Sequence, residues 1–341
     1  MKNKKISGLF ILLCCLMSVT LSGCTDKEAV SKTDFYFDTV VTITLYGNQN
    51  VKYIDECFSI CEKYENLLSR TKENSEISLI NDNRNTYVNV SDDTIDIINK
   101  GLYYSELSKG KFDITIGALS DLWDFESDDP VIPSESDIRK NIAFVDYKNV
   151  IVDDNKVMLS SGGAKLDLGG IAKGFIADKL KQYLESKGIT SGIIDLGGNI
   201  LLLGSKPDNT DYNIAIKKPF GKSGENSAVV ITSDKSIVSS GNYERYFYKD
   251  NVLYHHILDT STGYPVNNNL MSVTIISDSS TDGDGLSTSC FALGIDDGME
   301  LIESIDNVEA VFIDDDYNIH LSSGLKDEGD YDGLMKIKLK D

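Results

Sequence analysis

The segment KLDLGGIAKGFIADKL, residues 165–180, passes from a short apolar run through a glycine turn into a helical pattern. Asp167 precedes Gly169 and Gly170, and Lys173 and Gly174 follow them. Glycine allows close backbone approach, and the first amides of a helix point at anions. The spacing matches neither the G-x-G-x-x-G fingerprint nor the P-loop. The residues alone leave two interpretations: a turn that contacts a phosphate ligand, or tight helix–strand packing with Asp167 as a solvated or capping acid.

The helix predicted over residues 171–187 is followed by short strands, and short strands also precede the segment, over 142–168. Helices are further predicted over 50–68, over 91–110 and from Asp284 onward, and "SEIS" (75–78) is a short helix or turn. Strands are predicted at 35–47, at a hairpin turning at residues 197–199, at 212–217, 227–233, 243–249, 252–258 and 270–278, and again near the C-terminus. Adjacent strands outnumber β-α-β units. We therefore expect an α+β fold of antiparallel sheets with packed helices.

The first 23 residues have the pattern of a processing signal. Three lysines precede a mostly apolar core, Ile6 to Leu21, which is too short for a comfortable membrane span. "LSGC" (21–24) resembles the bacterial lipobox, in which cleavage precedes the cysteine and Cys24 receives the lipid. An ordinary secretory signal with a chance cysteine is the alternative. We expect a signal peptide at 1–23, a polar tether at 24–33, and a lipid-anchored protein on the extracytoplasmic face of the cell membrane.

The chain is strongly acidic. Its formal net charge is −21, and removal of the three lysines in residues 1–23 makes it −24. Nucleic-acid binding needs a basic surface, so we expect no nucleic-acid partner. Adhesion to anionic lipid is equally disfavoured, which leaves the lipid on Cys24 to anchor the protein. The remaining residues suffice for one large domain or two fused lobes, and no linker is apparent within 34–341.

The cysteines after the signal give no disulfide framework. Cys57 and Cys61 lie four residues apart in an amphipathic helical pattern, where a disulfide would have poor geometry. Two thiols alone are a weak metal signal. We interpret both as buried apolar residues.

Asp284 and Thr288, in "STDGDGLSTSCFALG" (280–294), would share one face of a helix because they lie four residues apart. A carboxylate and a hydroxyl are hard oxygen ligands that suit Mg²⁺. The alternative makes Asp284 the N-cap of the helix and Thr288 incidental.

His255 and His256 occur in "YHHILDTSTGYPV" (254–266). Neighbours on a strand face opposite sides, so only one of them is expected to point into a given cleft. An imidazole beside a metal–phosphate site could act as a general base, or it could be an interior group bonded to the turn that follows.

Taken together, these stretches resemble the ApbE family of FAD:protein FMN transferases. The resemblance runs from about residue 34 to the C-terminus and implies one large ApbE-like (T-fold-like) domain over 34–341. Its motifs occur in the family's order: "FDT" (37–39), "SEIS" (75–78), "GKFDITIGALSDLW" (110–123), "DLGGIAKGFIAD" (167–178), "DLGGN" (195–199), "SSGNYERYF" (239–247), "HILDTSTGYPV" (256–266) and "DGLSTSCFALG" (284–294).

The resemblance implies a Mg²⁺-dependent transfer of FMN from FAD to a threonine or serine hydroxyl of a target protein, with release of AMP. Asp284 and Thr288 would be side-chain metal ligands, and Gly170 would offer its carbonyl. His256 would be the catalytic base, and Asp284 would act in catalysis through the metal. Contacts to FAD would come from Phe37, Thr71, Lys111, Phe112, Asp113, Asp167, Lys173 and His256.

Four positions depart from the family pattern. Phe37 stands where methionine is usual, and Thr71 where an aromatic residue or asparagine often touches the flavin. Thr260 replaces the proline of the D-P-x-T-G turn, and Gly285 replaces an alanine.

The acceptor implied by the family is an extracytoplasmic or membrane redox protein with a D-G-x-[ST]-G-A-T-like motif. The chain lacks a full match, so we do not expect it to modify itself. Three rival functions remain at this stage. They are an FAD pyrophosphatase that yields FMN and AMP, a non-catalytic flavin-binding lipoprotein, and a solute-binding lipoprotein, for which the β-α-β alternation is missing.

Overall fold

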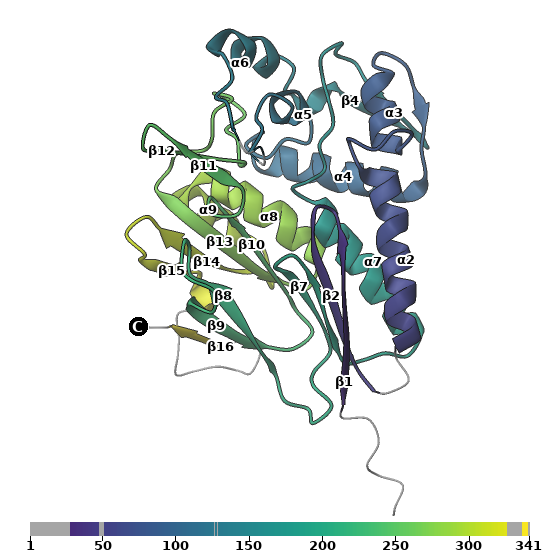
Figure 1. Cartoon of the computed structure of the whole chain (residues 1–341), viewed down its shortest axis with the longest axis vertical. Coiled ribbons are helices and arrows are strands. Elements are labelled where there is room, and N and C mark those ends of the chain that lie inside the picture. The colour runs from purple at the N-terminus through teal and green to yellow at the C-terminus, as the bar shows by residue number, and fades with distance from the viewer. Residues whose placement is uncertain (1–27, 48–50, 126, 128, 326–335, 340–341) are drawn as a thin grey trace, which may run out of the picture.

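An eight-stranded sheet forms the centre of the protein, and every neighbouring pair in it is antiparallel (Figure 1). The computed structural model describes residues 28–47, 51–125, 127, 129–325 and 336–339. Across the sheet the order is β1 (Ala29–Tyr36), β2 (Thr39–Tyr46), β6 (Gly192–Leu196), β7 (Asn199–Leu203), β10 (Ser236–Gly241), β13 (Leu270–Ser277), β14 (Glu309–Asp314) and β15 (Ile319–Leu321).

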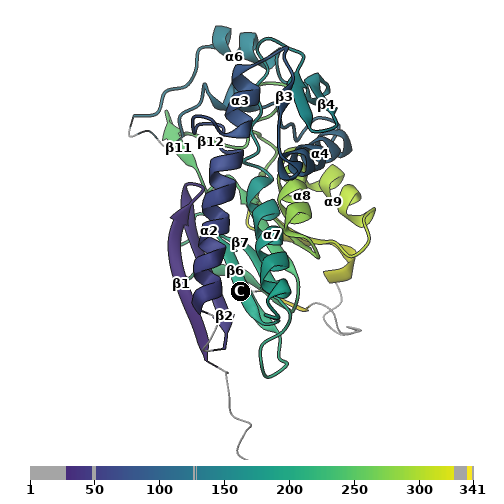
Figure 2. The same cartoon turned by 90° about the vertical axis from the view of Figure 1, so that its right-hand side faces the viewer.

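A layer of helices covers one face of this sheet (Figure 2). It consists of α2 (Val51–Leu68), α7 (Ala172–Ser186), α8 (Ser280–Leu293) and α9 (Ile295–Glu303). The helix α7 buries Phe175, Ile176, Leu180 and Leu184, which recur at helical spacing and join the main hydrophobic core. The three thiols of Cys57, Cys61 and Cys290 are buried and free, and burial raises their pKa values to about 12, as expected of inert apolar residues.

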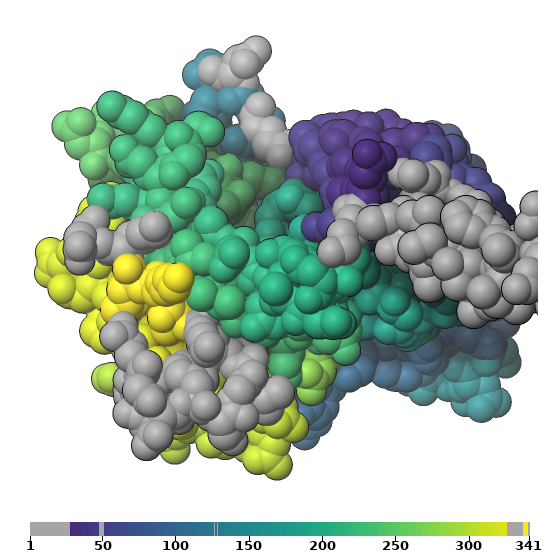
Figure 3. All heavy atoms as spheres, turned by 90° about the horizontal axis from the view of Figure 1, so that it is seen from below, coloured from purple at the N-terminus to yellow at the C-terminus, as the bar shows by residue number. Residues whose placement is uncertain are grey.

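The other face of the large sheet carries a second, three-stranded sheet. Its order is β16 (Lys336–Leu339), β9 (Asn226–Thr232) and β8 (Tyr212–Lys217). Buried and exposed residues alternate along β8, so its inner face supplies Tyr212, Ile214 and Ile216 to a second core. All eight residues of β13 are buried because this strand lies between the two cores. From below, the purple β1–β2 hairpin and the yellow β16 lie on opposite sides of the molecule (Figure 3).

The remaining elements gather at one end of the sheet (Figure 1). They are α3 (Glu76–Asp82), α4 (Asp92–Leu107), α5 (Gly117–Ser120), α6 (Glu135–Ile142), the 3₁₀ turn Tyr147–Asn149, the small sheet β3 (Val88–Asn89), β5 (Lys156–Leu159) and β4 (Val150–Asp153), and the ribbon β11 (Tyr246–Lys249) and β12 (Val252–His255). A second 3₁₀ turn, Ser323–Leu325, lies elsewhere, after β15 and against β14. Trp123 anchors a small core here, with its indole N–H donating to the Gly263 carbonyl at 3.0 Å.

The predicted fold class is confirmed, and most predicted elements are present. The strand predicted at 35–47 is confirmed over Thr39–Tyr46 but not before it, because Phe37 and Asp38 both have φ of 55° and turn the chain into a hairpin between β1 and β2. The strand β10 and the helix α9 were not predicted. The helix predicted from Asp284 begins at Ser280 and is capped by Ser279, so the capping role of Asp284 is wrong.

The described helices include none that is both long and apolar enough to cross a membrane. The predicted signal, the lipidated Cys24 and residues 24–27 of the predicted tether lie outside the described residues. The tether prediction is wrong over Ala29–Thr33, because these residues pair with β2 as part of β1.

Asp93, in the first turn of α4, joins three helices. Its carboxylate accepts hydrogen bonds from Lys63 Nζ at 2.9 Å and Tyr64 OH at 3.0 Å on α2, and it pairs with Lys179 Nζ of α7 at 2.8 Å. Burial acts to raise the pKa of Asp93, but these three contacts outweigh it and lower the pKa to about 2. Because the folded pKa lies below the ordinary value, the ionised group stabilises the fold above about pH 4, and this contribution is lost as the pH falls toward 2.

We expect Asp93→Asn to lower the free energy of unfolding at pH 7 by about 1–2 kcal/mol, and by progressively less as the pH falls from 4 to 2. Asp96→Asn is the control, since Asp96 is 62% exposed on the same helix and lies 3.8 Å from Lys179. Urea unfolding of the two variants and the wild type across this pH range measures the effect. Equal losses from both variants at pH 7 would contradict the assignment.

Candidate active site

The glycine turn before α7 lies directly against α8. A Cβ built on Gly170 would lie 3.6 Å from Thr288 Oγ1 and 2.9 Å from the Phe112 ring. Gly170, Thr288 and Phe112 were each predicted to belong to the site, and the structure brings the three together. Only a residue without a side chain fits between the hydroxyl and the ring.

Asp284 is buried in the middle of α8 and is held by groups from two other elements. Its Oδ2 accepts from the Gly174 N–H at 2.5 Å, and its Oδ1 accepts from Asn199 Nδ2 at 3.0 Å. Burial raises the pKa of Asp284 to about 6, against the opposing effects of Lys173, the Gly174 amide and Asn199. The carboxylate is therefore mostly ionised at pH 7, and further positive charge nearby would stabilise its ionised form.

The N-terminus of α8 is fixed by a single carboxylate of α7. Asp178 accepts hydrogen bonds from Ser280 N, Thr281 N, Thr281 Oγ1 and Ser279 Oγ, at 2.6–2.9 Å. Further along α8, Ser240 Oγ lies 2.9 Å from Ser287 Oγ and 3.2 Å from Thr288 Oγ1. These contacts determine where the face that carries Asp284 and Thr288 points.

The predicted ligands Asp284, Thr288 and the Gly170 carbonyl would supply only oxygen donors, which suit Mg²⁺ better than a softer metal. In the described part of the chain no three His, Cys, Asp or Glu side chains group as a metal site. The predicted ligands include only one side chain of these four types, Asp284, so they would not form such a group of three. The buried carboxylate whose pKa is raised to about 6 is the observation that favours a cation here.

The two histidines have different environments. His255 is buried, with Nε2 at 2.9 Å from the Val266 carbonyl and Nδ1 accepting from the Ile257 N–H at 3.3 Å. Burial lowers its pKa to about 4. His256 has a buried Nδ1 without a hydrogen-bond partner among the described residues, and burial together with Arg245 lowers its pKa to about 3. The imidazole of His256 is therefore neutral at pH 7 and has a free nitrogen.

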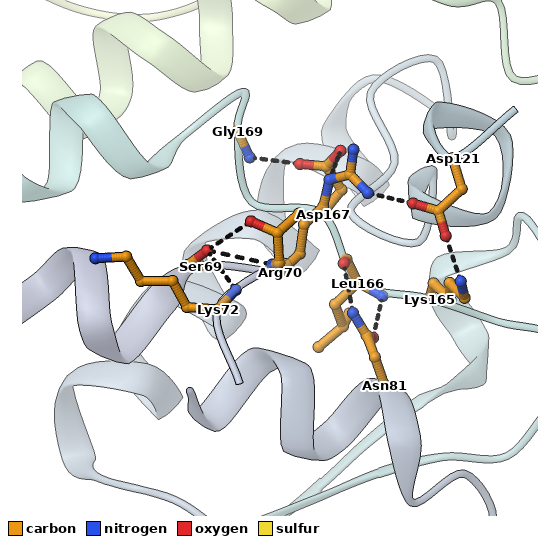
Figure 4. Close-up of polar contacts among 10 residues, drawn as sticks. Ser69, Arg70, Lys72, Asn81, Asp121, Lys165, Leu166, Asp167 and Gly169 are labelled. Carbon is orange, nitrogen blue, oxygen red and sulfur yellow. Dashed lines mark hydrogen bonds and ion pairs between the residues drawn. The ribbon is translucent and has the colours of Figure 1, made fainter. Parts of the chain in front are cut away.

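Asp167 lies at the entrance to the glycine turn, with its carboxylate held on both sides (Figure 4). Its Oδ1 accepts from the Gly169 N–H at 2.9 Å, and its Oδ2 pairs with Arg70 Nε at 3.2 Å. Thr71 is exposed and lines a neighbouring pocket of about 220 Å³.

The other predicted contacts are more dispersed. Lys111 pairs with Asp259 at 3.4 Å, and both oxygens of Asp113 accept hydrogen bonds from within the chain, from Thr115 and from Tyr147 N. Phe37, in the hairpin turn, donates its N–H to Glu65 Oε1 at 2.8 Å. Contacts from these residues to FAD stay predictions.

Two of the departures from the family pattern have a physical reason. A Cβ at Gly285 would lie 2.3 Å from the Tyr104 ring, so this chain needs glycine where α4 crosses α8. Thr260 donates its hydroxyl to the Gly110 carbonyl at 2.7 Å and so ties the turn to the segment before Lys111.

Four residues of the site were not singled out from the sequence: Arg70, Asp178, Asn199 and Ser240. The last three lie inside motifs that define the resemblance, but nothing in their spacing indicates that they hold Asp284 or α8. Arg70 precedes Thr71 and carried no signal of its own.

The chain matches the ApbE family model over residues 37–312. It is 31% identical to an FAD:protein FMN transferase of Treponema pallidum, with 93% of each chain covered. It is 33% identical to one of Klebsiella pneumoniae, with 87% of this chain and 93% of the relative covered.

Solved structures agree. The ApbE protein of Thermotoga maritima superposes with a TM-score of 0.81 at 31% identity, covering 87% of this chain and 97% of that one. The flavin transferase ApbE of Vibrio cholerae gives 0.78 at 28% identity, with the same coverage.

Gly174 offers a test of how tightly the site is built. A Cβ there would lie 2.0 Å from the Ser280 carbonyl oxygen, so Gly174→Ala must push α7 and α8 apart. Glycine to alanine inside a helix normally stabilises by roughly 0.5–1 kcal/mol, but here we expect a loss of about 1–3 kcal/mol.

Gly162→Ala is the control, because its Cβ would meet only Asn85 Nδ2, at 3.9 Å. Urea unfolding of both variants measures the difference. A Gly174→Ala protein as stable as wild type would show that the helices can separate without loss.

Proposed function

Because the chain belongs to the ApbE family, we propose that it is a flavin transferase that moves FMN from FAD to a threonine or serine hydroxyl of a redox protein. The transfer releases AMP and uses Mg²⁺. The observation that carries the proposal is the identity of 31–33% to named FAD:protein FMN transferases over most of both chains. The acceptor is an extracytoplasmic or membrane protein with a D-G-x-[ST]-G-A-T-like motif.

The residues of the site suit this reaction. Asp284, Thr288 and the Gly170 carbonyl would hold the Mg²⁺, with Asp284 as the one anionic protein ligand. When bound, the metal neutralises phosphate oxygens and stabilises the departing AMP. Gly174 and Asn199 keep the carboxylate in place before any ligand arrives, because each donates a hydrogen bond to one of its oxygens. A site arranged in advance needs no reorganisation at the moment of reaction.

His256 is the proposed base for the acceptor hydroxyl. Its free Nδ1 can take a proton, and its neutral state at pH 7 leaves that nitrogen available. Arg245 and Lys173 contribute to its low pKa, and an anionic pyrophosphate beside these cations would raise it toward the range in which a base is effective.

Lys173 supplies positive charge at the site of a protein whose overall negative charge would otherwise repel the anionic pyrophosphate of FAD. Its positive charge lowers the pKa values of Asp284, Asp195 and His256, so it lies within electrostatic range of all three groups. We assign it a contact to the phosphates of FAD. Positive charge concentrated in this site offsets the overall charge of −21 where the substrate binds.

Asp284→Asn should reduce FMN transfer by several orders of magnitude at millimolar Mg²⁺, since metal stabilisation of phosphoryl charge contributes several kcal/mol. Asp282→Asn is the matched control on the same helix, because Asp282 bonds instead to Tyr104 OH and Lys100. Covalent FMN on an acceptor peptide is measured by intact mass, with and without EDTA, alongside a melting curve.

Near wild-type transfer by a folded Asp284→Asn protein would refute the assignment. If FMN and AMP accumulate equally with and without the acceptor peptide, the protein is an FAD pyrophosphatase. If FAD binds and stays intact, it is a flavin-binding lipoprotein.

The proposal includes a lipid anchor at Cys24, supported by the basic start, the short apolar core and "LSGC". Cys24→Ala should move the protein from the membrane fraction to the soluble extracytoplasmic fraction, because one apolar core of this length does not span a bilayer. Fractionation and immunoblotting measure this. Membrane retention of the variant at the wild-type level would exclude the lipobox.

A further inference from the structure

Asp167 is the inner end of a chain of four alternating charges (Figure 4). Arg70 Nε lies 3.2 Å from Asp167 Oδ2, and Arg70 Nη1 donates to Asp121 Oδ1. The other oxygen of Asp121, Oδ2, accepts from Lys165 Nζ. One guanidinium therefore joins two carboxylates, and a lysine two residues before Asp167 completes the chain.

The backbone around this chain is fixed independently of the charges. Asn81 of α3 binds Leu166 twice, donating to its carbonyl at 3.0 Å and accepting from its N–H at 2.7 Å. The Asp167 N–H donates to the Ile114 carbonyl at 2.8 Å. A Cβ on Gly117 would lie 2.7 Å from the Lys165 carbonyl oxygen, so this glycine lets α5 approach and carry Asp121 to Lys165. The backbone position of Asp167 is thereby set, and its side-chain orientation is left to Arg70 and the Gly169 amide.

The chain of charges contributes little to stability. The side chains of Arg70, Asp121 and Lys165 are 30%, 32% and 37% exposed, whereas that of Asp167 is 18% exposed. Ion pairs this accessible to water typically contribute little to the free energy of unfolding, because water screens them and two long side chains lose freedom. Instead, this row of ion pairs holds the carboxylate of Asp167, the least exposed of the four side chains, in one orientation.

We propose that Arg70 is a positioning residue for FAD, which holds the Asp167 carboxylate in the orientation that binds the cofactor, with Asp121 and Lys165 holding Arg70. The inference rests on the proposed function. A carboxylate accepts hydrogen bonds and repels phosphate, so Asp167 recognises an N–H or O–H group of FAD and not its pyrophosphate.

The neighbouring pocket fits this assignment. Arg70, Thr71, Asp121 and Lys165 line it, and its volume of about 220 Å³ is below that of sites that enclose a whole ligand, roughly 300–1,000 Å³. The pocket is therefore too small for FAD, and Asp167 is not among its lining residues. The FAD group that Asp167 binds accordingly lies outside the pocket, and Arg70 acts on it only through Asp167.

The test measures FAD affinity by calorimetry in EDTA, so that no turnover occurs. Arg70→Gln should weaken FAD binding about tenfold, the scale for a hydrogen-bond acceptor that has lost its orientation. Arg70→Lys should lie between Arg70→Gln and wild type, because a lysine is a point charge and cannot join two carboxylates as a fork does. Arg139→Gln is the control: Arg139 pairs with Glu135 on the surface of α6 with its side chain 72% exposed, and its loss should leave the affinity within about twofold.

A double-mutant cycle separates positioning from direct contact. If Arg70 acts through Asp167, then Arg70→Gln should change the affinity less than about twofold in a protein that already carries Asp167→Asn. A full tenfold loss in that background would show that Arg70 touches FAD itself and would overturn the inference. Asp121→Asn, which releases Arg70 without altering Asp167, should weaken binding in the same direction by a smaller factor.

The outcomes also separate this inference from the proposed function. Wild-type protein that binds no FAD would count against the proposed function as a whole. Wild-type protein that binds FAD, together with folded Arg70→Gln and Asp121→Asn variants of unchanged affinity, would overturn the role of Arg70 alone. A lowered melting temperature with unchanged affinity would reduce Arg70 to a structural residue.

Discussion

Gly174 brings α7 and α8 so close that a Cβ at this position would lie 2.0 Å from the Ser280 carbonyl oxygen. The close approach lets the Gly174 N–H reach the Asp284 carboxylate at 2.5 Å, and one turn later Asp178 receives the first amides of α8. The position of Asp284 and Thr288 relative to the glycine turn follows from these two contacts. The sheet and both hydrophobic cores support this crossing, because β10 and β13 lie beneath α8 (Figure 1).

Burying a carboxylate is unfavourable unless hydrogen bonds or positive charge compensate it. Asp284 receives two hydrogen bonds and the field of Lys173, yet its pKa remains raised to about 6. The fold thus buries an acidic group whose ionised form a nearby cation would stabilise. Such a strongly shifted pKa is more typical of a functional site than of a residue in the hydrophobic core. His256 is the complementary case, a neutral imidazole with a free nitrogen among positive charges.

Glycine serves three different purposes within this one region. At Gly170 it leaves room between the Phe112 ring and Thr288, at Gly174 it allows two helices to cross, and at Gly285 it admits the Tyr104 ring. Each requirement comes from a neighbour distant in sequence. The alanine usual in the family at the position of Gly285 would not fit against Tyr104 as this chain places it.

The sequence by itself determined the fold class, the helices over 51–68, 92–107 and 172–186, the hairpin at residues 197–198, and the family. These depend on local periodicity, turn residues and motif order, all of which are properties of the linear sequence and need no contact between distant residues. It failed at Phe37 and Asp38, where a hairpin turn interrupts an alternating run, since strand alternation continues on both sides of such a turn. It also could not tell that Asp284 is buried inside a helix, that Asn199 binds it, or that Arg70 holds Asp167. Those facts depend on contacts between residues that are far apart along the chain, with sequence separations of 85, 97 and 110 positions. Only the packing of the helices on the sheet decides which of these residues meet.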